Sequence, residues 1–198
     1  MGIGGGAPGS SAPYTIFRNM YFIQKNLDYE LVMVTNQDGL GTEVYPENTF
    51  WPVHNFIMNA FENEGVVFSD VFIDKTFPHE NANTRKPKTG LLGKYFSAEY
   101  DLENSFVIGD RLTDIELAKN LGAKAIFIND ETNLGTDEIS VKRKDLDSFI
   151  ALESNDWQKI YAFLKLENRT VELTRNTNET KIKEATNFFI QLSPLKKI

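Results

Sequence analysis

Two carboxylates four positions apart mark the stretch of this chain with the clearest capacity for chemistry. Asp110 follows Gly109 and the short apolar run from Ser105 to Ile108, and Asp114 opens an amphipathic pattern one helical turn later. A buried parallel strand delivers polar side chains to the carboxyl edge of its sheet, where open α/β folds bind ligands. Two neighbouring anions need a cation, and oxygen ligands favour Mg²⁺. Alternatively, Asp114 only complements the helix dipole.

Two further segments place polar groups where strands or helices begin or end. Thr35 and Asn36 close an apolar run that starts at Glu30, and a glycine-containing loop follows them. Hydroxyl, amide and backbone donors at such a tip suit an anion, although the same residues could serve only the turn. Residues 85–88 carry three cations at the start of an expected helix, where the dipole opposes them unless an anion lies near. A solvated charge run is the alternative.

The apolar patterns that position these groups alternate between helix and strand. This alternation predicts an α/β fold with a doubly wound parallel sheet. Its expected elements are a helix over 14–27, a strand over 30–34, a helix over 48–64, a strand over 66–73, a helix after 90, a strand over 105–108, a helix over 110–120 and a strand over 123–128. Beyond them we expect an irregular stretch over 129–155, a helix over 157–164, an isolated strand over 169–182 and an apolar tail with no evident core to join.

Composition excludes several classes of function. The chain has 198 residues, 41% of them hydrophobic, which suffices for one core and part of a second. A net charge of -7 argues against nucleic-acid binding, and the lack of cysteine excludes disulfides and thiol catalysis. No apolar run approaches the roughly 20 residues of a membrane span. Residues 1–13 read as a flexible leader without a signal sequence, so we expect a cytoplasmic protein with no membrane partner.

Three motifs together resemble one family, the haloacid-dehalogenase-type phosphatases. They are Val34 to Thr42, Arg85 to Pro87, and Val107 to Ala118. The histidinol-phosphatase domain of histidine biosynthesis is the most similar, over roughly residues 16–165. The resemblance implies a Rossmann-like fold and a magnesium-dependent hydrolysis of a small phosphorylated metabolite, histidinol phosphate, through an aspartyl-phosphate.

The resemblance also assigns roles around the phosphate. Thr35 resembles the hydroxyl that holds the phosphate, with Asn36 beside it. Lys86 resembles the catalytic lysine that neutralises the charge of phosphate and nucleophile, and Arg85 a contact on the substrate side. A lysine and a magnesium ion would together match a phosphate dianion.

For metals, the resemblance implies one site and excludes another. Asp110 resembles the Mg²⁺ ligand, and Asp114 an acidic partner that steadies the metal site. Members of the family often bind structural zinc in the loop before Arg-Lys-Pro. Here the matching positions hold no zinc-binding set, so we expect no structural zinc and a loop held by hydrogen bonds and packing. These positions are Asp74, Thr76, Ala82 and Thr84.

The chain departs from the family at its beginning. The opening motif Asp-x-Asp-Gly-Thr, which supplies the nucleophile and the general acid/base, is missing, and Asp28 is the only aspartate among residues 1–34. We therefore expect the first strand, the central one of the sheet, to be missing and to leave an exposed apolar gap. Losing a covalent nucleophile costs on the order of 10⁶ in turnover in a serine protease. Hydrolysis should be impaired, and the alternative is a non-catalytic domain that binds phosphate or a partner.

The tail resembles a second domain. Residues 169–182 are similar to the opening strand of imidazoleglycerol-phosphate dehydratase, which follows the phosphatase in bifunctional histidine-biosynthesis proteins. We therefore divide the chain into the leader, a phosphatase-like domain over 14–166 and a dehydratase-like fragment over 167–198. With only His54 and His79 available, the fragment has no histidine-rich metal site and should have no dehydratase activity. A nucleotide-binding module is disfavoured because no glycine fingerprint follows the first strand.

Overall fold

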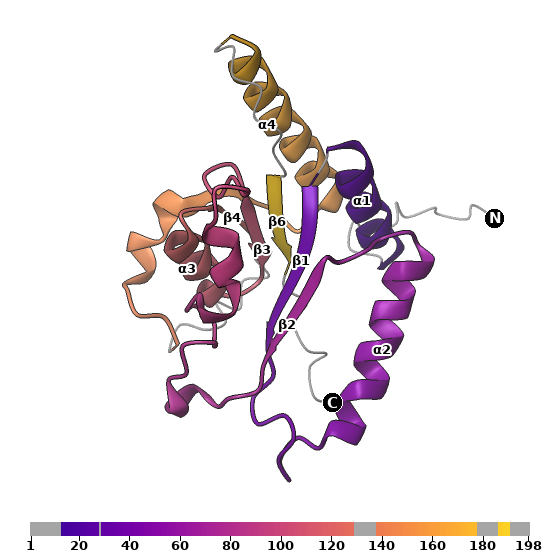
Figure 1. Ribbon diagram of the computed structural model, residues 1–198, viewed down its shortest axis with the longest axis vertical. Helices are drawn as coiled ribbons and strands as arrows, with labels where there is room; N and C mark the ends of the chain where they lie inside the picture. The colour runs from indigo at the N-terminus through magenta and orange to yellow at the C-terminus, as the bar shows by residue number, and fades with distance from the viewer. Residues whose placement is uncertain (1–12, 28, 129–137, 178–185, 191–198) are drawn as a thin grey trace, which may run out of the picture.

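A parallel β-sheet forms the centre of the molecule (Figure 1). The computed structural model describes residues 13–27, 29–128, 138–177 and 186–190. Within them the sheet has six strands in the order β2-β1-β6-β3-β4-β5, and every pairing is parallel. The predicted α/β class is therefore confirmed. The strands are β1 (Tyr29–Asn36), β2 (Asp70–Asp74), β3 (Phe106–Gly109), β4 (Lys124–Phe127), β5 (Ile150–Glu153) and β6 (Thr186–Ile190).

Helices cover both faces of this sheet. Figure 1 shows α1 and α2 on one side of the strands and α3 on the other. The α-helices are α1 (Pro13–Asn26), α2 (Glu47–Asn63), α3 (Leu112–Leu121) and α4 (Trp157–Thr177). Short 3₁₀ turns are η1 (Pro78–Glu80), η2 (Gly90–Phe96), η3 (Arg143–Asp145) and η4 (Asp147–Phe149). None of the described helices is long and apolar enough to cross a lipid bilayer.

Two apolar cores lie between the sheet and its helices, one on each face. Along β1, Leu31 and Met33 pack with α1 and α4, whereas Val32 and Val34 pack with α3 on the opposite face. Successive side chains of a strand point to opposite faces, so a strand covered on both sides reads as an unbroken apolar run. The continuous run in β1 therefore follows from its central place in three layers.

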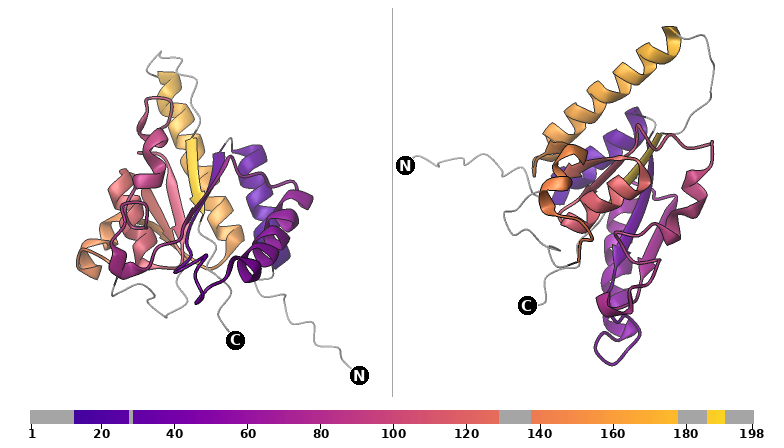
Figure 2. Two further views of the ribbon diagram at one scale, coloured as in Figure 1. Left: turned by 60° about the horizontal axis from the view of Figure 1, so that its bottom comes forward. Right: turned by 90° about the vertical axis from the view of Figure 1, so that its left-hand side faces the viewer.

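The centre of the sheet corrects one expectation from the sequence. We expected a gap where the first strand is missing and a tail with no core to join, but β6 occupies the position between β1 and β3 (Figures 1 and 2). Phe188 aligns with Leu31 on one side and with Phe106 on the other. Two facing strand edges would otherwise leave rows of unpaired N–H and C=O groups, and a strand between them satisfies both.

A second expectation was also wrong. The alternating pattern over 169–182 predicted an isolated strand, yet α4 continues through Thr177. Extending an existing helix adds one hydrogen bond for each residue fixed, so a helix already nucleated at Trp157 outweighs a short alternation. Of the leader expected over 1–13, Pro13 begins α1. Residues 1–12, Asp28 and residues 178–182 lie outside the described residues. The stretch expected to be irregular contains η3, η4 and the short strand β5.

Candidate functional site

The predicted site residues belong to loops that leave the carboxyl ends of neighbouring strands. Thr35 and Asn36 end β1, which pairs with β2 as far as Asp74. Asp110 follows the last residue of β3. Since all strands of the sheet run parallel, these ends meet at one edge, which is where α/β folds bind ligands.

Lys86 joins two of these loops from within the core. Its side chain is 1% exposed, and its Nζ donates to the carbonyl oxygen of Val34 at 3.1 Å and to Oδ1 of Asp114 at 3.0 Å. Asn36 brackets the backbone of Lys86, because Asn36 Nδ2 donates to Lys86 O and Lys86 N donates to Asn36 Oδ1, both at 3.1 Å. The structure thus brings together Asn36, Lys86 and Asp114, one residue from each of the three motifs.

Asp114 is held in place by the first turn of α3. Its Oδ2 accepts a hydrogen bond from Arg111 N at 3.1 Å. A Cβ on Gly109 would lie 2.2 Å from this Oδ2, so only glycine leaves room for the carboxylate. Asp110 is half-buried, and its charge acts on both Lys86 and Asp114. Gly109 therefore has a packing role beyond the turn inferred from the sequence.

Burial and ion pairing have opposite effects on the pKa values of Lys86 and Asp114. Burial lowers the pKa of Lys86 below its ordinary value, and the neighbouring carboxylates partly offset this. Burial raises the pKa of Asp114, and the ammonium of Lys86 counteracts it. Each group favours the charged form of the other, which makes the pair sensitive to the loss of either member.

Thr35 lies beside these groups in a second hydrogen-bonded chain. Thr35 is 3% exposed, and its Oγ1 accepts a hydrogen bond from Gln37 Nε2 at 2.8 Å. Gln37 N donates to the carbonyl oxygen of Asp74 at 2.7 Å. Gln37 was not among the site residues predicted from the sequence. Its only signal was an amide side chain two positions beyond a hydroxyl at a strand tip.

Arg85 occupies a different setting from the substrate contact that the resemblance implied. Its side chain is 6% exposed; Nη1 lies 2.7 Å from Asp38 Oδ1 and 2.9 Å from Thr76 O, and Nη2 lies 2.6 Å from Glu138 Oε2. Burial acts to lower the pKa of Arg85, but the two ion pairs raise it above its usual value. Arg85 therefore cross-links three loops, and a direct contact with substrate stays a prediction. No local sequence pattern indicated Asp38 or Glu138 as its partners.

Asp110 and Asp114 differ in how well they could bind a magnesium ion. Both oxygens of Asp114 are already hydrogen-bonded, so Asp110 is the better candidate ligand. In the described part of the chain, no group of three or more His, Asp or Glu side chains could hold a metal by itself. Mg²⁺ is usually bound by one or two carboxylates together with phosphate oxygens and water. The residues therefore fit an ion that is shared with a bound phosphate.

The loop before Arg85 is held by hydrogen bonds, as expected. Of the four positions that match zinc ligands in the family, three are linked to one another: Asp74 accepts hydrogen bonds from Thr76 and Thr84. A carboxylate and two hydroxyls form such hydrogen bonds readily, whereas zinc prefers nitrogen and sulfur ligands. The absence of structural zinc itself stays a prediction.

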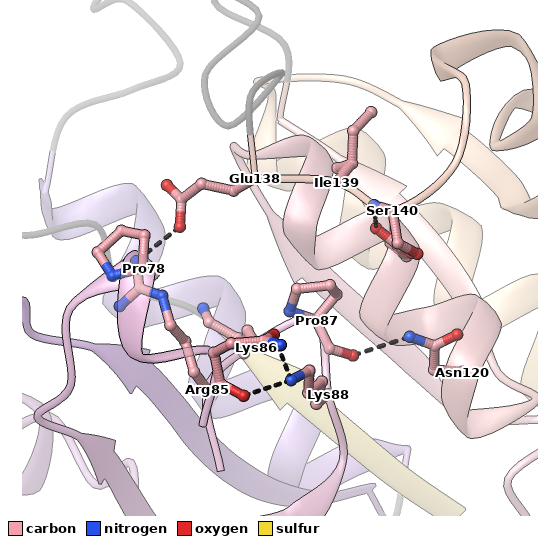
Figure 3. A pocket seen from close by; sticks show the side chains of 11 residues that line it. Pro78, Arg85, Lys86, Pro87, Lys88, Asn120, Glu138, Ile139 and Ser140 are labelled. Atoms are coloured by element: carbon pink, nitrogen blue, oxygen red, sulfur yellow. Dashed lines mark hydrogen bonds and ion pairs between the residues drawn. The ribbon is translucent and has the colours of Figure 1, made fainter. Parts of the chain in front are cut away.

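A cavity of about 380 Å³ lies next to the Lys86 loop (Figure 3). It is bordered by residues 85–88, by Asn120 and Glu116 of α3, and by 138–140. Asn120 Nδ2 donates to Pro87 O at 2.9 Å, and Ser140 N donates to Glu116 Oε2 at 2.8 Å, so the walls are tied together. The volume falls within the range of small-molecule sites.

Comparisons with known proteins agree with this architecture. A family model described as "HAD-hyrolase-like" matches residues 83–146, which include the second and third motifs. A solved structure of D,D-heptose 1.7-bisphosphate phosphatase from B. bronchiseptica, complexed with magnesium and phosphate, is similar with a TM-score of 0.56. The similarity covers 82% of this chain and 84% of that one, at 17% sequence identity, and thus concerns the fold.

Curated relatives are more similar in sequence. The histidine biosynthesis bifunctional protein HisB of Bacteroides fragilis is 50% identical over 173 residues, which are 87% of this chain and 45% of that protein. HisB of Spirosoma linguale is 52% identical over 164 residues, 81% of this chain and 43% of the relative. The chain thus spans less than half the length of these relatives. The expected resemblance to the haloacid-dehalogenase-type phosphatases is confirmed by the family model over residues 83–146 and by these relatives.

Proposed function

We propose that this chain is a phosphatase-type domain that binds a phosphomonoester and Mg²⁺ at the edge formed by Thr35, Lys86 and Asp110. The observation that carries the proposal is the contact of Lys86 with Val34 and Asp114, because it joins all three motifs at one place. The similarity to proteins named for histidine biosynthesis supports histidinol phosphate as the substrate. The cavity beside Lys86 offers space for the organic part of such a metabolite.

The side chains suit a phosphate dianion. An ammonium group has three N–H donors, and two in Lys86 have acceptors in Val34 and Asp114, which leaves the third for a phosphate oxygen. A pair of unit charges 4 Å apart is worth about 4 kcal/mol at an effective dielectric of 20. The Thr35 hydroxyl, oriented by Gln37, donates to a second oxygen. A magnesium ion held by Asp110 would neutralise further charge and polarise the phosphoryl group.

Turnover should be strongly impaired in this chain. The strand at the centre of the sheet, β6, has the sequence Thr-Asn-Phe-Phe-Ile and carries no carboxylate. A nucleophile of the Asp-x-Asp type is therefore not supplied by the strand between β1 and β3. This observation favours a second candidate function, a non-catalytic domain that binds phosphate or a partner through the same residues.

Phosphate binding tests both candidates at once. Inorganic phosphate is titrated calorimetrically into the chain with and without MgCl₂. We expect Lys86→Ala and Thr35→Val to weaken binding at least about tenfold, the effect of losing one charge-assisted hydrogen bond. Lys124→Ala is the matched control, because Lys124 begins β4 at the opposite edge of the sheet and forms an ion pair with Glu167. Equal affinities in all variants would rule out a phosphate site at Thr35 and Lys86.

Hydrolysis separates the two candidates. The parent chain is compared with a variant in which residues 1–12 are replaced by an apolar strand that ends in Asp-x-Asp-Gly-Thr and residues 186–198 are removed, so that the new strand can take the position of β6 between β1 and β3. We expect magnesium-dependent release of phosphate from histidinol phosphate only from the variant. A folded variant that binds phosphate but does not hydrolyse histidinol phosphate would support the non-catalytic binding function and contradict the phosphatase function. A cytoplasmic location and the lack of nucleic-acid and membrane partners stay predictions.

A further inference from the structure

The carboxylate of Asp74 organises the loop that follows β2. Its Oδ1 accepts hydrogen bonds from Thr76 N at 2.9 Å and from Thr76 Oγ1 at 2.5 Å, and its Oδ2 accepts one from Thr84 Oγ1 at 2.5 Å. Asp74 is 3% exposed. A buried carboxylate is costly unless donors surround it, and these three donors fix its orientation.

These bonds close the loop immediately before the cationic motif. Thr84 precedes Arg85, so its bond to Asp74 anchors the chain one residue before Arg85 and two before Lys86. The carbonyl oxygen of Thr76 in turn accepts a hydrogen bond from Arg85 Nη1 at 2.9 Å. The two ends of the segment 76–84 are thereby both tied to Asp74.

The same residue also touches the loop after β1. Asp74 aligns with Asn36 in the β1–β2 register, and its carbonyl oxygen accepts a hydrogen bond from Gln37 N at 2.7 Å. Gln37 Nε2 then donates to Thr35 Oγ1. Asp74 thus stands between the hydroxyl and the ammonium that the proposed function assigns to phosphate.

We infer that Asp74 is a positioning residue that sets the place of Lys86 relative to Thr35. Its carboxylate acts on the Lys86 loop through Thr84, without touching the phosphate. Its backbone carbonyl holds Gln37, so substitution of the side chain removes the first link and keeps the second. The inference concerns the geometry of the loops, and only its consequence for affinity rests on the proposed function. A residue that merely stabilised the fold would affect other parts of the sheet as much as this loop.

Hydrogen exchange of the intact chain tests the geometry without any ligand. In the parent, Lys86 N is bonded to Asn36 Oδ1 and Lys88 N to Arg85 O. We expect Asp74→Ala to raise the exchange rate of these two amides at least about tenfold, while amides of β3 change less than about threefold, because local opening needs less free energy than global unfolding. Asp74→Asn has the same shape and keeps one acceptor oxygen, so it should restore most of the protection.

Asp101→Ala is the matched control. Asp101 also holds a turn, with Oδ1 accepting from Asn104 N and Oδ2 from Asn104 Nδ2, but away from the candidate site. Faster exchange at Lys86 and Lys88 in Asp74→Ala alone supports the inference. Parent-like exchange in Asp74→Ala, or an equal loss of protection in Asp101→Ala, overturns it.

Phosphate affinity gives the second measurement. We expect inorganic phosphate to bind Asp74→Ala at least about tenfold more weakly than the parent and Asp74→Asn within about threefold of it, since a displaced lysine loses a charge-assisted contact. Loosened loops with unchanged affinity would overturn the positioning role. If the parent itself binds no phosphate, the proposed function fails, and the exchange measurement still decides whether Asp74 positions the loop.

Discussion

Lys86 Nζ lies 3.0 Å from Asp114 Oδ1, and both side chains are almost completely buried. One residue comes from the loop after β2 and the other from the first turn of α3, so this ion pair joins two halves of the sheet edge. Two charges removed from water are tolerated only when they compensate each other. Each of the two buried charges is therefore tolerated in the folded state only while the other is present.

Removing one member of this pair should destabilise the chain markedly. Lys86→Met keeps most of the side-chain volume but leaves Asp114 buried without its cation. We expect the free energy of unfolding to fall by about 3–5 kcal/mol, as for other broken buried pairs. Urea denaturation measures this free energy.

The double variant Lys86→Met/Asp114→Asn should recover part of the loss, and additive effects of the two substitutions would contradict the coupling. Lys75, whose ion pair with Glu47 is exposed, provides a control in Lys75→Met that should change stability little.

Gly109 should tolerate no side chain. A methyl group there would lie 2.2 Å from Asp114 Oδ2, so Gly109→Ala must displace the carboxylate or the strand end. We expect a loss of about 1–3 kcal/mol in the free energy of unfolding, typical of overpacking. Gly93→Ala is the control, because no atom lies within 4 Å of the added carbon. Similar melting temperatures for the two variants would show that Asp114 does not press on Gly109.

Tyr95 should make stability depend on alkaline pH. Its hydroxyl donates to Asp70 Oδ2 at 2.5 Å, and burial, reinforced by Asp70, raises the pKa of Tyr95 above its ordinary value. An unfolded tyrosine ionises near pH 10, so the unfolded state loses its proton first and the free energy of unfolding falls as pH rises above about 10. Tyr95→Phe should cost about 1–2 kcal/mol at pH 8 and show a shallower decline above pH 10. Parallel curves from urea unfolding at pH 8 to 11 would refute this role.

The pairing of β6 should hold the two halves of the sheet together. Phe189 aligns with Val32 of β1 and with Val107 of β3. Proline lacks the backbone donor and is confined to edge strands, so Phe189→Pro should cost on the order of 3 kcal/mol. Amide exchange should accelerate in both β1 and β3. Phe189→Leu keeps the amide and should preserve their protection; unchanged exchange in the proline variant would argue against β6 at the centre.

The sequence alone determined the class of the fold and predicted the loops of the candidate site. Apolar runs of the right length predicted β1, β3 and β4, and the polar residues directly after them predicted Thr35 and Asp110 at one edge. The strands and the two polar tips needed only local periodicity and the rule that parallel strands end at a common edge. The role of Lys86 was implied by the family resemblance, because the charge run alone was equally consistent with a solvated surface.

The tertiary structure alone decided which segments meet. It placed β6, the last strand among the described residues, in the middle of the sheet, where the sequence had suggested a gap. It also gave Arg85 its partners Asp38 and Glu138, which are 47 and 53 positions away. Such pairings carry no local pattern, because they arise when buried charges and open strand edges must find partners anywhere within reach of the folded chain.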